Sequence, residues 1–247
     1  MGRAGPAADW REAAAYAPLL DADRSVFAWE WLRRDPLYRA AAARGGETGA
    51  SPWGLHRFED PDLAAPRARP YWSRQRHRLV MLARARPSRM SADAVDLLSL
   101  PMAEAFSGCA GSGEHWLLSD GLHSIRLDLE EGSGRHGPVE LRYRLVGLQS
   151  VKRPLLSLRR LLALVDTGSF SRSLHPSEPK ARRWIMALRA HDALAAGMSQ
   201  RDIAAGLLGG AAGAPRWRID AASLRSQAQR LVRAARELAG GGWVRFL

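Results

Sequence analysis

Apolar residues recur at helical spacing near both ends of the chain and alternate with polar residues in its middle. Within residues 9–44, Phe27 and Trp31 share one helical face, because side chains four positions apart lie on the same side of an α-helix. Pro18 is expected to end a first helix, and Pro36 fits the first turn of a third. The pattern therefore predicts three short helices in this region.

The middle of the chain has the period of two that is typical of half-buried strands. Apolar residues alternate with charged ones most strictly in the first two of four candidate strands, which are 125–129, 141–145, 115–118 and 80–82. The glycine-rich stretch 131–138 is interpreted as a hairpin-type loop between the first two. A short helix is expected near 91–106. Together these segments predict a small antiparallel sheet.

The last third of the chain returns to helical spacing. Apolar residues of 155–165 predict a helix that ends near Gly168, and residues 181–197 predict another, with Trp184 facing inward and Arg189 outward. The last predicted helix has apolar residues spaced by four, three, four and three positions: Leu224, Ala228, Leu231, Ala235 and Leu238.

The order of these patterns predicts an α+β protein in three parts. The predicted parts are N-terminal helices in 1–48, a mixed β-rich domain in 49–150 with a small central antiparallel sheet, and an all-α domain in 151–247. A chain of 247 residues is long enough for several compact units.

Charge is distributed unevenly between these parts. The net charge is +12, and 35 of the 37 basic residues are arginine, which a GC-rich genome alone would explain. Residues 1–150, however, hold 20 basic and 19 acidic residues, whereas 151–247 hold 17 basic and 6 acidic ones. A local basic field of this size attracts polyanions. Nucleic acid is therefore the first partner to expect, and an acidic membrane surface a distant second.

The composition also bears on the compartment. No run approaches the roughly 20 apolar residues of a membrane span, and the N-terminus lacks the apolar core of a signal peptide. Cys109 is the single cysteine, so no internal disulfide can form. We expect a cytoplasmic protein that does not enter the membrane.

The turn chemistry of the last third is typical of a helix-turn-helix. Gly197 permits a sharp turn, and the Ser199-Gln-Arg-Asp202 segment has the form of a capping box. Small residues at 204 and 205 let two helices cross closely. An arginine-rich amphipathic helix is often only a solvated surface helix, but here three helices and the local charge agree.

The polar face of the last helix supplies the candidate DNA contacts. Residues near the start of a recognition helix usually approach base edges, so Ser223, Arg225, Ser226 and Gln229 are predicted to contact bases. Phosphate contacts are predicted for the remaining basic residues, Arg201, Arg216, Arg218, Arg230 and Arg233.

Catalytic and metal chemistry find little support in the sequence. The seven histidines, at 56, 77, 115, 123, 136, 175 and 191, are scattered without metal-ligand spacing. Cys109 has no histidine close by in sequence, and no nucleophile motif occurs. We therefore expect no enzyme, no cofactor and no metal.

Several of these segments resemble two known bacterial domains. Asp9-Trp-Arg, Tyr16, Leu19-Leu20 and the run from Asp23 to Arg39 resemble a transcriptional regulator-like N-terminal domain. From about Leu141 onward the chain resembles the RovC-type DNA-binding domain of type VI secretion transcription factors. The matching pieces are Arg183, Gly197, Arg201-Asp-Ile-Ala204, Leu224-Arg225, Arg230-Leu231 and Gly241-Gly-Trp243. The resemblance implies DNA binding and transcription control by an oligomer.

Taken together, the sequence predicts a bacterial-type regulator that binds double-stranded DNA sequence-specifically through its C-terminal third. A homo-oligomer and contact with the transcription machinery are expected. Two alternatives stay open: a DNA-binding protein for replication or mobile-element maintenance, and an interaction protein whose basic face meets an acidic partner.

Overall fold

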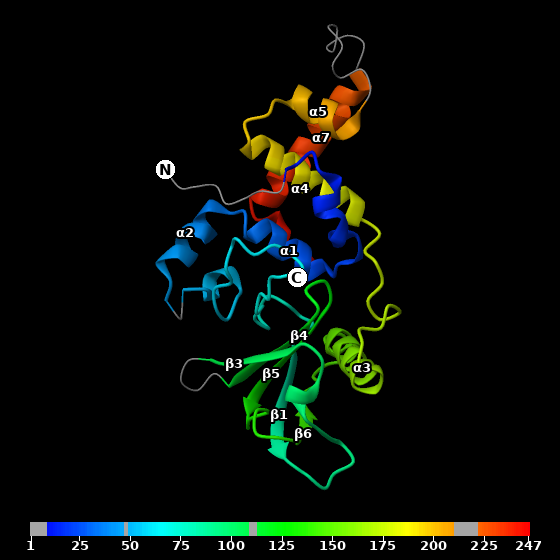
Figure 1. Ribbon diagram of the computed structural model, residues 1–247. Coiled ribbons are helices and arrows are strands. Elements are labelled where there is room, and N and C mark those ends of the chain that lie inside the picture. Colours follow the sequence, from blue (N-terminus) through cyan, green and yellow to red (C-terminus); the bar gives the residue numbers. More distant parts are fainter. Residues whose placement is uncertain (1–8, 47–48, 109–112, 210–221) are drawn as a thin grey trace. The chain divides into compact units, whose positions relative to one another are not determined.

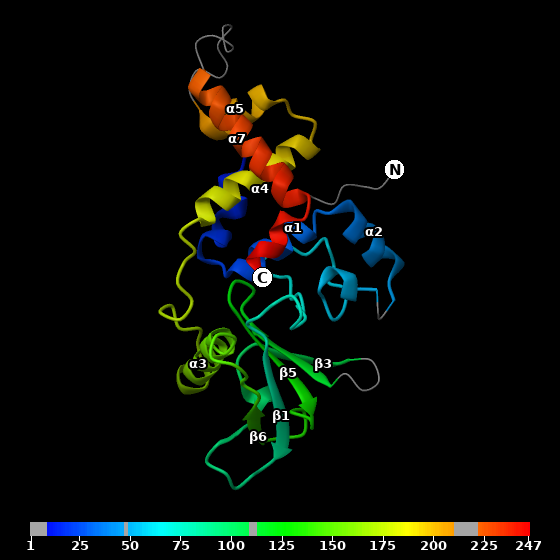
Figure 2. The same cartoon turned by 180° about the vertical axis from the view of Figure 1, so that it is seen from behind.

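The protein is described here by a computed structural model that covers residues 9–46, 49–108, 113–209 and 222–247 (Figures 1 and 2). These residues form two compact units. The first, called the helical unit below, joins the N-terminal residues up to Arg39 with Ser177–Phe246. The second, called the sheet unit, spans Ala40–Pro176. Both ends of the chain thus contribute to the helical unit.

The helical unit contains the helices that the sequence predicts at both ends of the chain. They are the 3₁₀ helix η1 (Ala13–Asp21), α1 (Arg24–Leu32), α2 (Pro36–Arg44), in which the boundary between the units falls, α4 (Ala181–Ala195), α5 (Gln200–Leu208), α7 (Ala222–Ala239) and the 3₁₀ helix η5 (Gly242–Phe246). The α+β class predicted from the sequence is confirmed. Pro18 lies inside η1 and does not end it, contrary to the prediction.

Aromatic packing joins the two ends of the chain within the helical unit. The ring of Phe27 on α1 lies edge-on to Trp184 on α4, with 5.0 Å between ring centroids. Phe246 of η5 closes the group, at 4.5 Å from Trp184 and 6.1 Å from Phe27. All three side chains are buried, so residues more than 150 positions apart in sequence share one core.

The sheet unit is built on six strands in the order β2-β6-β1-β5-β4-β3. Their bounds are β1 (Met81–Pro87), β2 (Ala94–Val95), β3 (Ala103–Ser107), β4 (Glu114–Ser119), β5 (Ser124–Glu131) and β6 (Val139–Tyr143). The predicted strands are all present, and β4 and β5 form an antiparallel hairpin. The β1–β5 pair is parallel, so the sheet is mixed where the sequence predicted an antiparallel one.

Two local predictions in this region are wrong. The predicted helix at 91–106 is replaced by β2, the short 3₁₀ helix η3 (Leu97–Ser99) and β3. The stretch 131–138 does not connect a hairpin, because β1 lies between β5 and β6 and pairs with both. A strand from an earlier part of the chain thus takes the place next to β5, with Met81 paired to Leu127.

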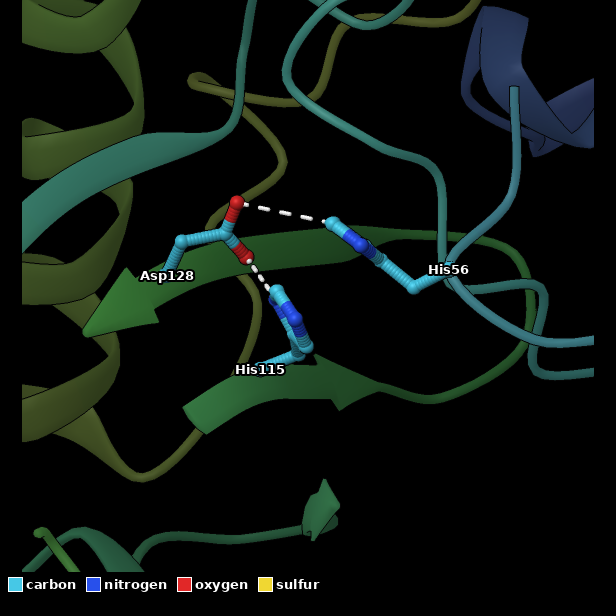
Figure 3. Close-up of side chains that lie close together, drawn as sticks. All are labelled: His56, His115 and Asp128. Atoms are coloured by element: carbon cyan, nitrogen blue, oxygen red, sulfur yellow. Dashed lines mark hydrogen bonds and ion pairs between the residues drawn. The ribbon is translucent and has the colours of Figure 1, made fainter. Parts of the chain in front are cut away.

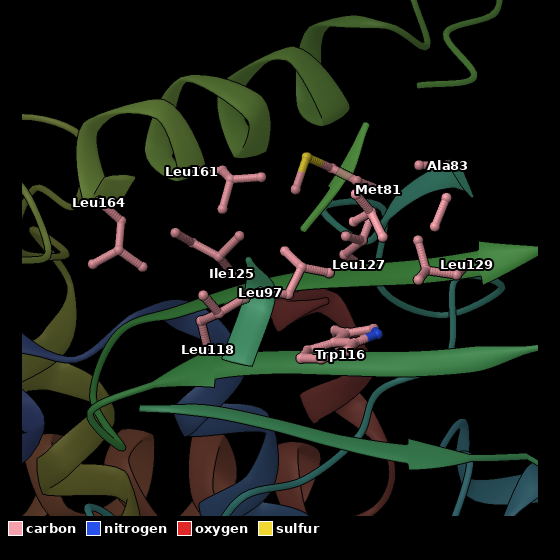
Figure 4. Packing of buried hydrophobic residues seen from close by; sticks show 12 residues of the cluster. Met81, Ala83, Leu97, Trp116, Leu118, Ile125, Leu127, Leu129, Leu161 and Leu164 are labelled. Atoms are coloured by element: carbon pink, nitrogen blue, oxygen red, sulfur yellow. The ribbon is translucent and has the colours of Figure 1, made fainter. Parts of the chain in front are cut away.

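One face of the sheet is covered by α3 (Lys152–Thr167), the first helix after the strands. Leu161 and Leu164 of α3 pack on Ile125, Leu127 and other apolar side chains of the strands (Figure 4). Gly168 ends α3 with a φ of 67°, a left-handed conformation that glycine adopts without the clash of a β-carbon, as the sequence predicted.

The predicted apolar stripe of α3 is only partly buried. Leu155, Leu162 and Val165 belong to that stripe but are 45%, 55% and 46% exposed. Leu161 and Leu164, with the partly buried Leu158, therefore make the contact with the sheet.

The opposite face of the sheet is covered as well, by residues between 54 and 72. Leu55 and Trp72 form an antiparallel bridge, and the His56 N–H donates to the Tyr71 carbonyl at 2.8 Å. Arg126 of β5, which the alternating pattern places on a solvent-exposed face, is buried and donates to the Pro70 carbonyl and the Ser124 hydroxyl. Arg126 and Asp128 on this face of β5 therefore meet protein, whereas Glu130, near the end of the strand, is exposed.

Within the part of the chain that the structure covers, none of the helices combines the length and the apolar character that crossing a bilayer requires.

Candidate nucleic-acid interface

The connection between α4 and α5 has the sharp turn that the sequence predicts. Gly197 follows α4 with a φ of 80°. The Ser199 hydroxyl then accepts a hydrogen bond from the Asp202 N–H at 3.2 Å, and the Asp202 carboxylate accepts one from the Ser199 N–H at 3.0 Å. The predicted capping box is thereby confirmed. These hydrogen bonds with Ser199 lower the pKa of Asp202.

Replacing the capping serine should weaken this turn measurably. We expect Ser199→Ala to lower the free energy of unfolding by about 1 kcal/mol, because a first-turn N–H of α5 loses its acceptor. Urea denaturation followed by circular dichroism measures the change. Gln200→Ala, at an exposed position one residue later, is the matched control and should leave stability almost unchanged. Equal loss in both variants would contradict the capping role.

Helix α7 packs on both α4 and α5 through one buried face. Ala228, Val232, Ala235 and Leu238 are buried there, and Ala228 packs against Ala204 of α5. Of the predicted stripe, Leu224 and Leu231 are only half-buried, and Val232 takes their place in the core. Small alanine side chains on both helices allow the close approach.

The opposite face of α7 is polar and exposed. Ser226, Gln229, Arg230 and Arg233 are exposed and follow one another at positions i, i+3, i+4 and i+7, which places them in one row along the helix. We call these four residues the α7 polar row. Two of them are arginines and two are neutral hydrogen-bonding residues, so the row can contact both phosphates and base edges.

The other predicted contact residues differ in their exposure and lie outside this row. Ser223 is exposed in the first turn of α7, with its hydroxyl 3.3 Å from the Gln227 amide nitrogen that donates to it. Arg225 is half-buried at the edge of the packed face. Arg201 is exposed in the first turn of α5. Arg216, Arg218 and also Cys109 lie outside the described residues.

A groove beside α7 brings the predicted contact residue Arg230 together with two basic residues that were not predicted to contact DNA. Its volume is about 830 Å³, and its lining includes the apolar side chains of Trp184 and Leu231. Lys180, Arg183 and Arg230 also line it. The helical pattern of residues 181–197 was enough to predict that Arg183 is exposed. Its proximity to Arg230 depends on the packing of α4 against α7.

Comparison with known families identifies two domains in the chain. Residues 148–247 match the family described as the DNA-binding domain of a T6SS (type VI secretion system) transcription factor, the RovC type. The chain carries a RovC-type DNA-binding domain. Residues 9–59 match the proteobacterial transcriptional regulator-like domain. The two domains indicate a DNA-binding transcriptional regulator. A comparison with curated proteins gave no match.

The regulator-like domain contributes directly to the fold around the RovC-type helices. Arg189 of α4, predicted to face outward, is buried and donates to the carbonyls of Trp10 and Arg11 at 2.8 and 2.9 Å. The Trp10 ring lies so close to Gly206 of α5 that an added β-carbon would be 2.5 Å from it. The residues before η1 thus hold α4 and α5 together.

A buried network of charges makes a second connection between the two domains. Arg34 donates to the Asp192 carboxylate of α4 at 2.7 and 2.8 Å and to the Glu30 carboxylate at 2.6 Å. The Tyr16 hydroxyl donates to Asp192 at 2.7 Å. Burial alone would raise the pKa of Asp192, but the hydrogen bonds and charge of Arg34 outweigh it and lower that pKa. Burial and the neighbouring Asp192 raise the pKa of Tyr16.

Proposed function

We propose that this protein binds double-stranded DNA sequence-specifically and controls transcription, with α7 as the recognition helix of a helix-turn-helix formed with α4 and α5. The observation that carries the proposal is the α7 polar row, exposed opposite a face that packs on two helices. An α-helix so presented fits the major groove of B-DNA, where a helix can reach base edges.

Phosphate contacts and base contacts fall to different residues, according to their side-chain chemistry. Arg230 and Arg233, with Arg201 on α5, bind phosphates, because a guanidinium pairs with phosphate oxygens at any sequence. Ser226 and Gln229 read base edges, with Ser223 and Arg225 nearer the start of α7. Arg216 and Arg218, just before α7 in sequence, add phosphate contacts. The regulator acts by binding and not by catalysis.

The first test measures binding by the full chain. Fluorescence anisotropy of labelled duplexes selected from a random library gives affinity and preferred sequence together. We expect a defined consensus and an association constant that falls steeply as salt rises, because phosphate contacts release counterions. Absence of any consensus, or binding that does not depend on salt, would contradict the proposal. Promoter-proximal sites in a genome-wide map favour transcription control over replication or mobile-element maintenance.

Two variants of the α7 polar row should separate the contact types. We expect Gln229→Ala to lose about 1–3 kcal/mol of discrimination at one base pair while nonspecific affinity is kept. Arg233→Ala should instead weaken binding to all sequences alike and reduce the slope of log K against log salt by about 1. The measurement is a set of salt titrations on the consensus and its single-base variants.

Arg89→Ala is the control for charge alone. Arg89 is an exposed arginine of the sheet unit, outside both matched domains. Its loss should change affinity little, whereas identical behaviour of Gln229→Ala and Arg233→Ala would refute the division of contacts.

A further inference from the structure

Two histidines and an aspartate meet on the face of the sheet opposite α3. His115 comes from β4, Asp128 from the neighbouring β5, and His56 from the segment that follows the 3₁₀ helix η2 (Ser51–Trp53) (Figure 3). The His115 Nδ1 lies 2.7 Å from Asp128 Oδ1, and the His56 Nε2 lies 3.5 Å from Asp128 Oδ2. The three ligand atoms all lie within 4.8 Å of one another.

These spacings fit atoms that share one cation. Nitrogen and oxygen ligands lie about 2.0–2.2 Å from a tetrahedral Zn²⁺, which puts neighbouring ligand atoms about 3.3–3.5 Å apart. The 3.5 Å from His56 Nε2 to Asp128 Oδ2 matches this spacing, and the 2.7 Å from His115 Nδ1 to Asp128 Oδ1 is shorter than it. Small side-chain rotations would therefore bring all three ligand atoms to a bound ion.

The simpler alternative is a hydrogen-bonded cluster that holds a loop to the sheet. It accounts for His115, whose ring nitrogen bonds the Asp128 carboxylate directly. It accounts less well for His56, whose buried Nε2 reaches Asp128 only as a 3.5 Å ion-pair contact and meets no closer acceptor in the part of the chain that the structure covers. A buried polar atom without a good hydrogen bond costs about 1–3 kcal/mol, and a metal ion would satisfy Nε2 more fully.

The surroundings of the cluster also resemble those of a metal site. The His56 and His115 rings stack with their centroids 3.6 Å apart. Phe106 of β3 packs beside His115, at 5.0 Å between centroids. His115 is only 4% exposed, and the side chains of Asp128 and His56 are 15% and 20% exposed. Metal ligands are commonly held by such an apolar shell, which restricts access of water.

We propose that His56, His115 and Asp128 bind a divalent transition-metal cation, of which Zn²⁺ best matches the ligands. Two imidazoles and one carboxylate suit this ion and leave its fourth position for water. The ion fastens the segment around His56 to β4 and β5. The three ligands do not belong to the α7 polar row. Failure of the metal proposal would therefore not count against the proposed DNA binding.

The test is a titration of the chelator-treated full chain with ZnCl₂. Isothermal calorimetry should show one site, and the melting temperature should rise with Zn²⁺, because an ion that binds only the folded state stabilises it. Co²⁺ in place of Zn²⁺ should give the visible absorption of a tetrahedral site. We expect His56→Gln to weaken Zn²⁺ binding by roughly tenfold or more and to abolish the thermal shift.

His136→Gln is the matched control, because His136 is an exposed histidine that is not among the three ligands. It should bind Zn²⁺ as the wild type does. His56 is partly exposed, so its replacement should leave the circular dichroism spectrum unchanged. Asp128→Asn gives a second, nearly isosteric variant. No Zn²⁺ binding by the wild type, or equal binding by His56→Gln and His136→Gln, would overturn the proposal.

Discussion

A fragment of residues 151–247 is expected to remain unfolded and to bind no DNA, although it contains α4, α5 and α7. The reason is that the helical unit takes part of its core from the N-terminal residues. Without Phe27, the apolar faces of Trp184 and Phe246 would be exposed to water. Circular dichroism and DNA anisotropy of the purified fragment check both expectations.

In this fragment, buried polar groups and the helix α3 would lose their partners as well. Arg189 would lose its two backbone acceptors, and Asp192 would lose both Tyr16 and Arg34. A buried charge left without its partner is more costly than a lost apolar contact of similar size. Leu161 and Leu164 would also lose the sheet they cover. Together these losses are comparable with the roughly 5–15 kcal/mol by which a whole domain is stable.

A spliced chain provides the control. Residues 9–44 joined by a flexible linker to 177–247 retain the partners of the helical unit and lack most of the sheet unit. This chain should fold and recover DNA binding. Cooperative unfolding and full affinity of the fragment 151–247 alone would show that the N-terminal residues are dispensable.

The elements of the fold could be predicted where local spacing decides them. Ile125, Leu127 and Leu129 alternate because one face of β5 packs on α3, and the pattern located that strand. The same pattern could not identify strand partners, because β1 reaches its place between β5 and β6 from a distant part of the chain. Nor could it show that Arg126 and Asp128 meet a second layer, at Pro70 and His56, instead of water.

The region 91–106 shows a different limit of local reasoning. Asp96 accepts a hydrogen bond from the Leu98 N–H and starts only the short turn η3, so a helical beginning is present but does not continue. The next residues pair with β4, and Ala105 lies opposite Trp116. Tertiary pairing overrides the local preference here.

The candidate sites also differ in whether local spacing or tertiary contacts decide the positions of their residues. The polar face of α7 was predictable because its opposite face is an apolar stripe, and the four residues of the α7 polar row are exposed as expected. Arg189 was misplaced because its acceptors are carbonyls of Trp10 and Arg11, nearly 180 residues earlier. His56, His115 and Asp128 have no recognisable spacing, since strand pairing and a loop bring them together.

Arg34→Ala should destabilise the helical unit by about 3–5 kcal/mol, the usual result of breaking a buried ion pair. Arg34 lies between the carboxylates of Glu30 and Asp192, and its side chain is 10% exposed. Its removal deprives the buried Asp192 of this guanidinium, while Glu30 keeps the ion pair with Arg33 at 2.8 Å. Urea denaturation followed by tryptophan fluorescence measures the loss, and Arg44→Ala, an exposed arginine in the last turn of α2, is the control.

The pH dependence identifies the cause of that loss. Because the folded protein holds the pKa of Asp192 below its value in the unfolded chain, this group stabilises the wild type above about pH 4, and the contribution is lost as pH falls through the folded pKa. Without Arg34, burial instead raises the pKa of Asp192. In the variant this group should then add stability as pH falls through its raised pKa, whereas in the wild type it loses stability there, so the difference between the two proteins should shrink at low pH. Parallel curves of unfolding free energy against pH for the two proteins would exclude the charge network as the source of the effect.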